Sequence, residues 1–231
     1  AHWDTAVPMV GRATRLDTIH DFWGFPEALY AIRYPATGCP EAADEVEKAI
    51  AAAGLPVARD EERGLDHGAW VPLRLMFPHA DVPVVPLSLQ SRGGTAHAIE
   101  LGRALAPLTE RGFLIIGSGS ITHNLRDFQT AMMSSTGTPE YVREFADWVA
   151  RHIDARESCD RILVPTRFAE QTFLERGVPA ARIRRAPSGA RAHPSEEHLL
   201  PLFVALGAAP AGGRTERFHA GIDDYVIAKD A

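Results

Sequence analysis

Cysteine, excess basic charge and long apolar runs are all scarce in this sequence. Only Cys39 and Cys159 occur among the 231 residues, too few for a disulfide framework or a cysteine-rich zinc module, so any metal must be held by His, Asp or Glu. The formal net charge of -6 gives no general attraction to nucleic acid or anionic lipid. No stretch approaches the roughly 20 apolar residues that span a bilayer, and no signal-peptide pattern is present. We expect a soluble, cytoplasmic protein without a nucleic-acid or membrane partner.

The composition is that of an ordinary globular protein, with 45% hydrophobic and 23% charged residues. It favours one large α/β domain over two small ones, and no internal repeat or low-complexity tract marks a boundary. We therefore expect a single domain over residues 1–231. Because the chain opens at "AHWDTAV" without an initiator Met, we also expect that an N-terminal segment of this domain is missing from the sequence.

Residues 39–54 carry a clear helical signal. Proline near the start, acidic residues in the first turn and a glycine at the end are typical of helix boundaries. Between these boundaries, Ala43, Val46 and Ile50 recur at helical spacing. The sequence therefore predicts an amphipathic helix that ends at Gly54.

Strand and helix signals alternate through the middle of the chain. Residues 81–90 and 113–117 predict buried strands, and residues 95–112 between them predict an amphipathic helix. Such a βαβ unit implies neighbouring parallel strands. The remaining expectations are an ordered loop up to about Phe25, helices at 138–155, 166–177 and 194–209, and a strand at 224–230. The fold class predicted is α/β, with a central, largely parallel or mixed sheet flanked by helices.

The loop "GSGSITHN" places His123 just after the strand at 113–117, where chemistry collects in α/β proteins. Its small residues could leave room for a substrate. Asn124 could orient a ligand or fix the imidazole tautomer. The structural alternative is a core histidine that caps the next helix. A phosphate-binding loop is disfavoured, because no Lys follows and the G-x-G-x-x-G spacing is absent.

Other histidines are candidates in their own right. His67 lies between an acid and a glycine, in a turn or in a loop that faces a substrate. His193 and His198 are five residues apart, about 140° around a helix, so both cannot share one helical face. Glu196 and Glu197 fit the first turn of that helix, where acids complement the helix dipole.

Five motifs, in order along nearly the whole chain, resemble the 4,5-DOPA extradiol dioxygenase family of LigB-like, class III extradiol ring-cleavage enzymes. They are "AHW", "TIHDFWGFP", "DHGAWVPLRLMFPHADVPVVPLSLQ", "GSGSITHNLR" and "HPSEEHLLPLFVALGAA". The resemblance implies a single α/β domain and a mononuclear non-haem metal site that opens catechol rings with dioxygen. Fe(II) is the metal it implies for activity, with Zn(II) as an alternative occupant.

The resemblance also assigns roles to particular residues. It makes His2 and His198 metal ligands, with Glu197 as a fallback ligand, and His123 the catalytic acid/base. By match to the family motifs, His67 and His193 are expected to bind the substrate. The family has a further ligand histidine in an N-terminal "HGSP"-type motif, which this sequence lacks.

The partners implied are a small catechol and O2; no motif distinguishes DOPA from other catechols or indicates an oligomeric state. Two other functions remain open from the residues. One is a non-catalytic protein that kept the fold and metal pocket, and the other is a zinc-dependent hydrolase, since zinc with three histidines can activate water.

Overall fold

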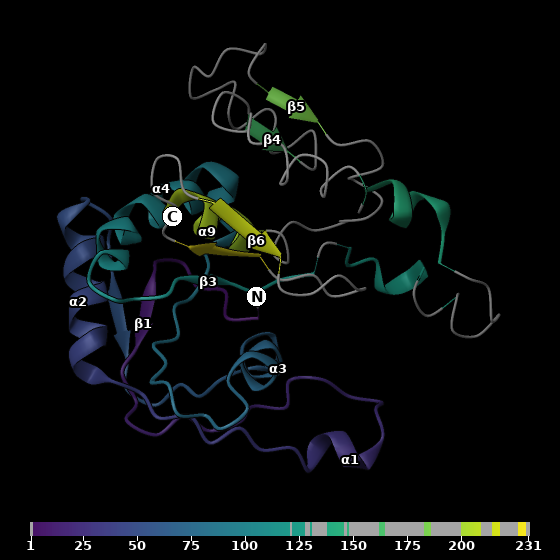
Figure 1. The fold of residues 1–231 in the computed structure, drawn as a ribbon, viewed down its shortest axis with the longest axis horizontal. Helices are drawn as coiled ribbons and strands as arrows, with labels where there is room; N and C mark the ends of the chain where they lie inside the picture. The colour runs from purple at the N-terminus through teal and green to yellow at the C-terminus, as the bar shows by residue number, and fades with distance from the viewer. Residues whose placement is uncertain are drawn as a thin grey trace.

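The computed structural model shows helices packed around short strands, in an α/β arrangement (Figure 1). It describes residues 2–120, 122–127, 130, 138–145, 147, 162–164, 183–185, 200–208, 214–217 and 226–229. Within these ranges no helix has the length and apolarity required to cross a membrane.

Helix α2 (Pro40–Ala52) forms where the helical signal predicted it. Its buried residues are Ala43, Val46 and Ile50, the three that recur at helical spacing. Gly54 follows with φ 78°, a left-handed conformation that glycine adopts without steric cost. The apolar face of α2 packs against α4 (Gly94–Thr109).

Helices α4 and α9 (Leu200–Ala208) form the centre of the larger core. Their backbones approach closely at two glycines. A Cβ on Gly102 would lie 2.8 Å from Gly207 Cα, and one on Gly207 would lie 3.0 Å from Gly102 Cα. The buried side chains around this crossing include Leu101, Leu105, Leu108, Tyr141, Phe145, Phe203 and Val204. Tyr141 and Phe145 belong to the helical residues 140–145, as predicted for that segment.

The described strands form three small sheets with mixed pairing. β1 (Met9–Gly11) is parallel to β2 (Ala58–Asp60), and β4 (Ile162–Val164) is parallel to β5 (Ile183–Arg185). β7 (Val226–Lys229) is antiparallel to both β3 (Ile116–Gly117) and β6 (Arg214–Arg217). The predicted α/β class, with helices around parallel and mixed strands, is confirmed.

The predicted pairing of 81–90 with 113–117 is not found among the described strands. Residues 81–90 contact the N-terminal segment instead: Ser88 N–H donates to Met9 O at 3.0 Å, and Leu89 N–H donates to Trp3 O at 2.8 Å. Prolines at 83 and 86 have no N–H to donate, so this segment forms isolated bridges in place of a continuous strand. β3 pairs with β7.

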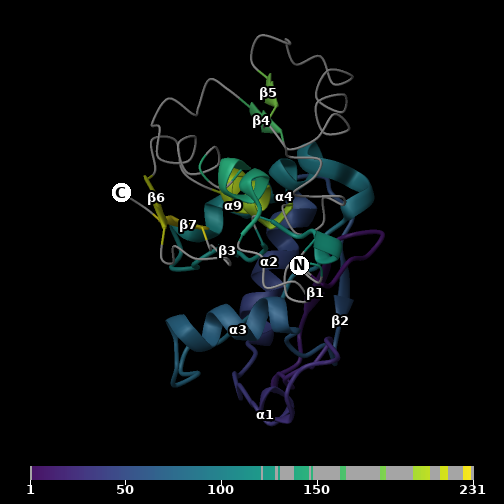
Figure 2. The same cartoon turned by 90° about the vertical axis from the view of Figure 1, so that its right-hand side faces the viewer.

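Two other parts of the first half differ from expectation. The stretch before Phe25 contains β1, and residues 67–76 form helix α3 (His67–Met76) where only a mixed segment was predicted. The remaining elements in this half are the short helix α1 (Glu27–Tyr30) and the 3-10 turn η1 (Ser91–Gly93). Figure 2 shows α3 and α1 at one end of the molecule, below α4 and α9. The helix predicted at 166–177 lies outside the described residues.

Candidate metal centre

His2, Asp21 and His67 come together from three separate segments. The Nδ1 atom of His67 lies 2.8 Å from Asp21 Oδ1, and the Nδ1 atom of His2 lies 3.4 Å from Asp21 Oδ2. The two imidazole rings are in contact, with centroids 4.1 Å apart. In both views the N-terminal end of the chain lies near α3, the helix that begins with His67 (Figure 1, Figure 2).

The donor set of this cluster fits a transition-metal ion. One ligand atom from each of the three side chains lies within 4.8 Å of the others. Imidazole nitrogen and carboxylate oxygen are ligands that iron and zinc both accept. The side chains of His2, Asp21 and His67 are 26%, 23% and 31% exposed, which leaves the cluster accessible to a small molecule.

Asp21 is held as a carboxylate by the start of α3. Burial raises the pKa of Asp21, but hydrogen bonds from the backbone N–H and the ring of His67 outweigh it, and the net pKa lies below the ordinary value. The N–H of His67 donates to Asp21 Oδ1 at 2.9 Å. Asp21 Oδ2 is buried without a hydrogen-bond partner among the described residues. This oxygen is therefore available for a proton or a cation.

His2 is biased toward its neutral form. Burial lowers the pKa of His2, and the adjacent His67 lowers it further. Since only neutral imidazole can bind a metal, this environment suits a ligand at neutral pH.

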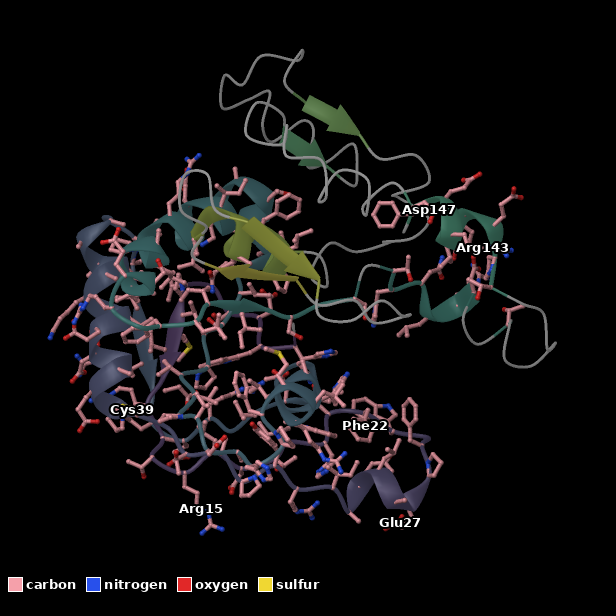
Figure 3. All side chains as sticks on the ribbon, viewed as in Figure 1. Arg15, Phe22, Glu27, Cys39, Arg143 and Asp147 are labelled. Atoms are coloured by element: carbon pink, nitrogen blue, oxygen red, sulfur yellow. The ribbon has the colours of Figure 1, made fainter. Side chains whose placement is uncertain are left out.

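Aromatic side chains form one wall of the cluster. Phe22 meets the His67 ring edge-on, with centroids 5.5 Å apart and planes at 87°. It lies between α3 and α1 in Figure 3. Trp70 of α3 is buried, and its Nε1–H donates to Ile19 O at 2.9 Å. The neighbouring His20 ring lies 3.0 Å from Ile32 O through Nε2, so its role there is to tie two loops together.

The loop that carries His123 is joined to the first turn of α3. Ser118, just after β3, donates a hydrogen bond through Oγ to the backbone carbonyl of Gly68. His123 itself is half-buried. Asn124 accepts the N–H of Asp127 through Oδ1 at 3.2 Å, so it caps the helical residues 125–127. The predicted capping role therefore falls to Asn124.

Gly117, the last residue of β3, makes room for a helix. A Cβ there would meet the backbone carbonyl of Pro201, and would lie 3.1 Å from the Cβ of Ala205. α9 therefore occupies the space that a side chain at this position would need, while Gly117 and Ser118 also line a cavity. His193 and His198 lie outside the described residues; α9 begins at Leu200, two residues after His198.

An apolar cavity of about 490 Å³ extends from the first turn of α3 to β3. Its lining includes Asp66 and Gly68, on either side of His67, and Trp3, next to His2. Ser118 lines it from the other side. Its volume is within the range of small-molecule sites, about 300–1,000 Å³.

Sequence reasoning identified His2 and His67 but missed Asp21. The carboxylate belongs to the quoted motif "TIHDFWGFP", directly after a candidate histidine. That adjacency was the available signal, yet Asp21 contacts His67, 46 positions away, and its neighbour His20 takes no part in the cluster described above.

Known proteins similar to this chain identify its family. Residues 1–223 match the family described as "Catalytic LigB subunit of aromatic ring-opening dioxygenase". "4,5-DOPA dioxygenase extradiol" of Beta vulgaris is 41% identical over 98% of this chain and 77% of its own length. The protein of the same name from Escherichia coli (strain K12) is 35% identical, over 90% of this chain and 70% of its own.

A solved structure shares the fold. The crystal structure of the uncharacterized protein JW3007 from Escherichia coli K12 has a TM-score of 0.68 and 27% identity, and the match covers 99% of this chain and 82% of that one. With a family match over nearly every residue, the chain belongs to the LigB family and is an aromatic ring-opening dioxygenase of the extradiol type.

Proposed function

We propose that the protein cleaves a DOPA-like catechol next to its diol with O2, at a mononuclear non-haem Fe(II) site. The observation that carries this proposal is the cluster of His2, Asp21 and His67. It brings the proposed ligand His2 together with a second imidazole and a carboxylate, in a chain that is 41% identical to an enzyme named for 4,5-DOPA. We assign Fe(II) because the reaction with O2 requires a redox-active metal, and zinc has no redox chemistry.

The proposed ligands are His2 and His198. When bound there, Fe(II) would supply Lewis acidity and the electrons through which dioxygen reacts with a catechol. The low pKa of His2 supports its role, because a neutral ring does not need to lose a proton before it binds metal.

His67 and His193 are the proposed substrate-binding residues. The ring of His67 lies against that of His2 and meets Phe22 edge-on. Its imidazole could hydrogen-bond a catechol hydroxyl, while Phe22 limits how the ring beside it can turn. The wall formed by Phe22 and Trp70 would help to keep water from that face of the site.

His123 is the proposed acid/base. An imidazole nitrogen of His123 would accept a proton from a catechol hydroxyl and return one later in the reaction. The hydrogen bond from Ser118 to Gly68 supports this role, because it ties the loop of His123 to the helix that begins with His67.

Oxygen uptake with a panel of catechols, after anaerobic loading with Fe(II), tests the function. We expect uptake with a DOPA-like catechol, and a loss of roughly 10²- to 10⁴-fold in kcat for His123→Ala, the usual contribution of a general acid/base. The matched control is His79→Ala, which removes an exposed histidine after α3 and should leave kcat unchanged.

Zn(II)-loaded protein should bind the same catechols without consuming oxygen. No uptake by the Fe(II)-loaded protein across the panel would refute the proposed function. Full turnover by His123→Ala would refute only its acid/base role.

A further inference from the structure

Asp21 accepts hydrogen bonds from the first residue of α3 through a single oxygen. Its Oδ1 accepts both the backbone N–H of His67, at 2.9 Å, and the ring Nδ1 of the same residue, at 2.8 Å. Helix α3 has no side-chain cap of its own from Asp66, the residue that precedes it. Asp21 therefore takes the place of the missing cap and is fixed relative to the first turn of α3.

This pairing determines which nitrogen of His67 carries a proton. A carboxylate oxygen only accepts hydrogen bonds, so the Nδ1 atom of His67 must be the donor. In the neutral ring the lone pair is then on Nε2, the nitrogen farther from Asp21. Without an acceptor at Nδ1, nothing in this pair would favour that tautomer over the other.

The second oxygen of Asp21 faces His2. Its Oδ2 lies 3.4 Å from the Nδ1 of His2, and it is buried without a hydrogen-bond partner among the described residues. A shift of a few tenths of an ångström would bring this pair within normal hydrogen-bond distance. Asp21 can thereby bridge two histidines whose rings already touch, with centroids 4.1 Å apart.

Direct ligation by Asp21 fits these contacts less well. Oδ1 already accepts two hydrogens from His67, and one of them is a backbone N–H that cannot be removed. Ligation through this oxygen would compete with both bonds. Histidines that bind metals in proteins commonly donate their other ring N–H to a carboxylate, and such partners contribute about 10- to 100-fold to metal affinity.

We propose that Asp21 is a positioning residue that holds His2 and His67 together in the Nδ1–H tautomer, so that each Nε2 presents its lone pair to the metal and substrate. The inference rests on the proposed roles of His2 as a ligand and His67 as a substrate-binding residue. It adds a shared carboxylate that couples the two.

The test uses Asp21→Asn in the full chain. An amide oxygen can still accept both hydrogens from His67 and keep the α3 cap, but its NH2 group would then face His2 Nδ1. The side-chain N–H of the new amide and the Nδ1–H of His2 would both be donors and could not pair. His2 would therefore adopt the Nε2–H tautomer, in which Nδ1 accepts a hydrogen bond. We expect Co(II) affinity to fall by about 10- to 100-fold. The absorption spectrum at saturating Co(II) should match that of the native protein, since the ligands are the same.

Nitrogen-15 NMR of the histidine rings in the metal-free protein reads the tautomers directly. The native protein should show Nδ1–H at His2 and His67, while Asp21→Asn should retain it at His67 and lose it at His2. Asp17→Asn, an exposed carboxylate on the same segment, is the matched control and should change neither readout.

Three outcomes would overturn the proposal: Nε2–H at His67 in the native protein, a Co(II) affinity within twofold of native for Asp21→Asn, or a changed spectrum at saturation, which would make Asp21 a ligand. None of these measurements uses turnover. Failure of the proposed ring-cleavage function would appear separately: the native protein would take up no oxygen although His2 and His67 carried Nδ1–H as expected.

Discussion

Replacing Gly117 with alanine should push α9 away from β3. The new Cβ would meet the carbonyl oxygen of Pro201, and would lie 2.8 Å from the carbonyl carbon and 3.1 Å from Ala205 Cβ. Because the first contact is with backbone, no side-chain rotation can relieve it, and α9 must move away from β3. Overpacking of this kind typically costs 1–3 kcal/mol, and we expect about 3 kcal/mol.

The loss should be visible in thermal unfolding. For a chain of this size, 1 kcal/mol corresponds to roughly 2–4 °C, so Gly117→Ala should lower Tm by roughly 6–12 °C. The shift also has a local consequence. β3 leads to the loop of His123, and α9 begins two residues after His198 in the sequence, so we expect a displacement of α9 to lower Co(II) affinity through the proposed ligand role of His198.

Circular dichroism melting and Co(II) titration together test this reasoning. Gly54→Ala is the control. A Cβ at Gly54 would meet no neighbouring atom, so this substitution strains the backbone, whose φ is 78°, without displacing a helix. It should cost about 1–2 kcal/mol through backbone strain alone and leave Co(II) affinity at the native value. If Gly117→Ala melts within about 2 °C of the native protein, the close approach of β3 to α9 is refuted.

Two further predictions concern the contacts around His67. Ser118→Ala should lower stability by about 1 kcal/mol, because the carbonyl of Gly68 loses its donor, and should also lower kcat in the oxygen-uptake assay; unchanged kcat would show that this bond does not position the loop. The metal-free protein should lose stability as pH falls below about 6.5, because the pKa of His2 is lowered from that ordinary value and the unfolded chain takes up a proton that the folded chain does not. The carboxylate of Asp21, whose pKa is also lowered, loses its contribution only below its ordinary value of 3.8. In His2→Gln the melting temperature should therefore change less between pH 5 and 7.5 than it does in the native protein. An unchanged pH dependence of the melting temperature in that variant would contradict the attribution of this effect to His2.

Helices whose signals are local were predictable from the sequence. In α2 the same three residues that recur at helical spacing, Ala43, Val46 and Ile50, are the ones buried. Their burial requires only that the apolar face of α2 packs against another apolar surface, here that of α4. Residues 67–76 gave no such signal, since Pro72 lies inside the helix and its start is capped by a residue far along the chain.

Strand pairing was less predictable, because pairing depends on backbone groups that sequence periodicity does not report. The apolar residues of 81–90 suited a buried strand, but prolines remove donors from it and the N-terminal segment pairs with what remains. β3 pairs with β7, more than 100 residues later, and no pattern within either strand specifies that partner.

The site was predictable only through motifs. The motif around His67 marked it as functional, while its contact with His2 required the fold. Asp21 had no comparable signal, because an Asp next to an aromatic in a loop is common and its significance comes from the 46-residue separation to His67. The assignments of His193 and His198 remain predictions, since both lie outside the described residues.

The cap on α3 has a consequence for protein engineering. A helix that carries its own capping residue can be moved to another scaffold as one continuous segment. α3 cannot, because the oxygen that caps it comes from Asp21. A graft of α3 with His67 must include the loop around Asp21 together with the helix, or the recipient protein must offer a carboxylate at the same place. Chimaeras between relatives should therefore be joined outside residues 21–67, so that loop and helix are inherited from one parent.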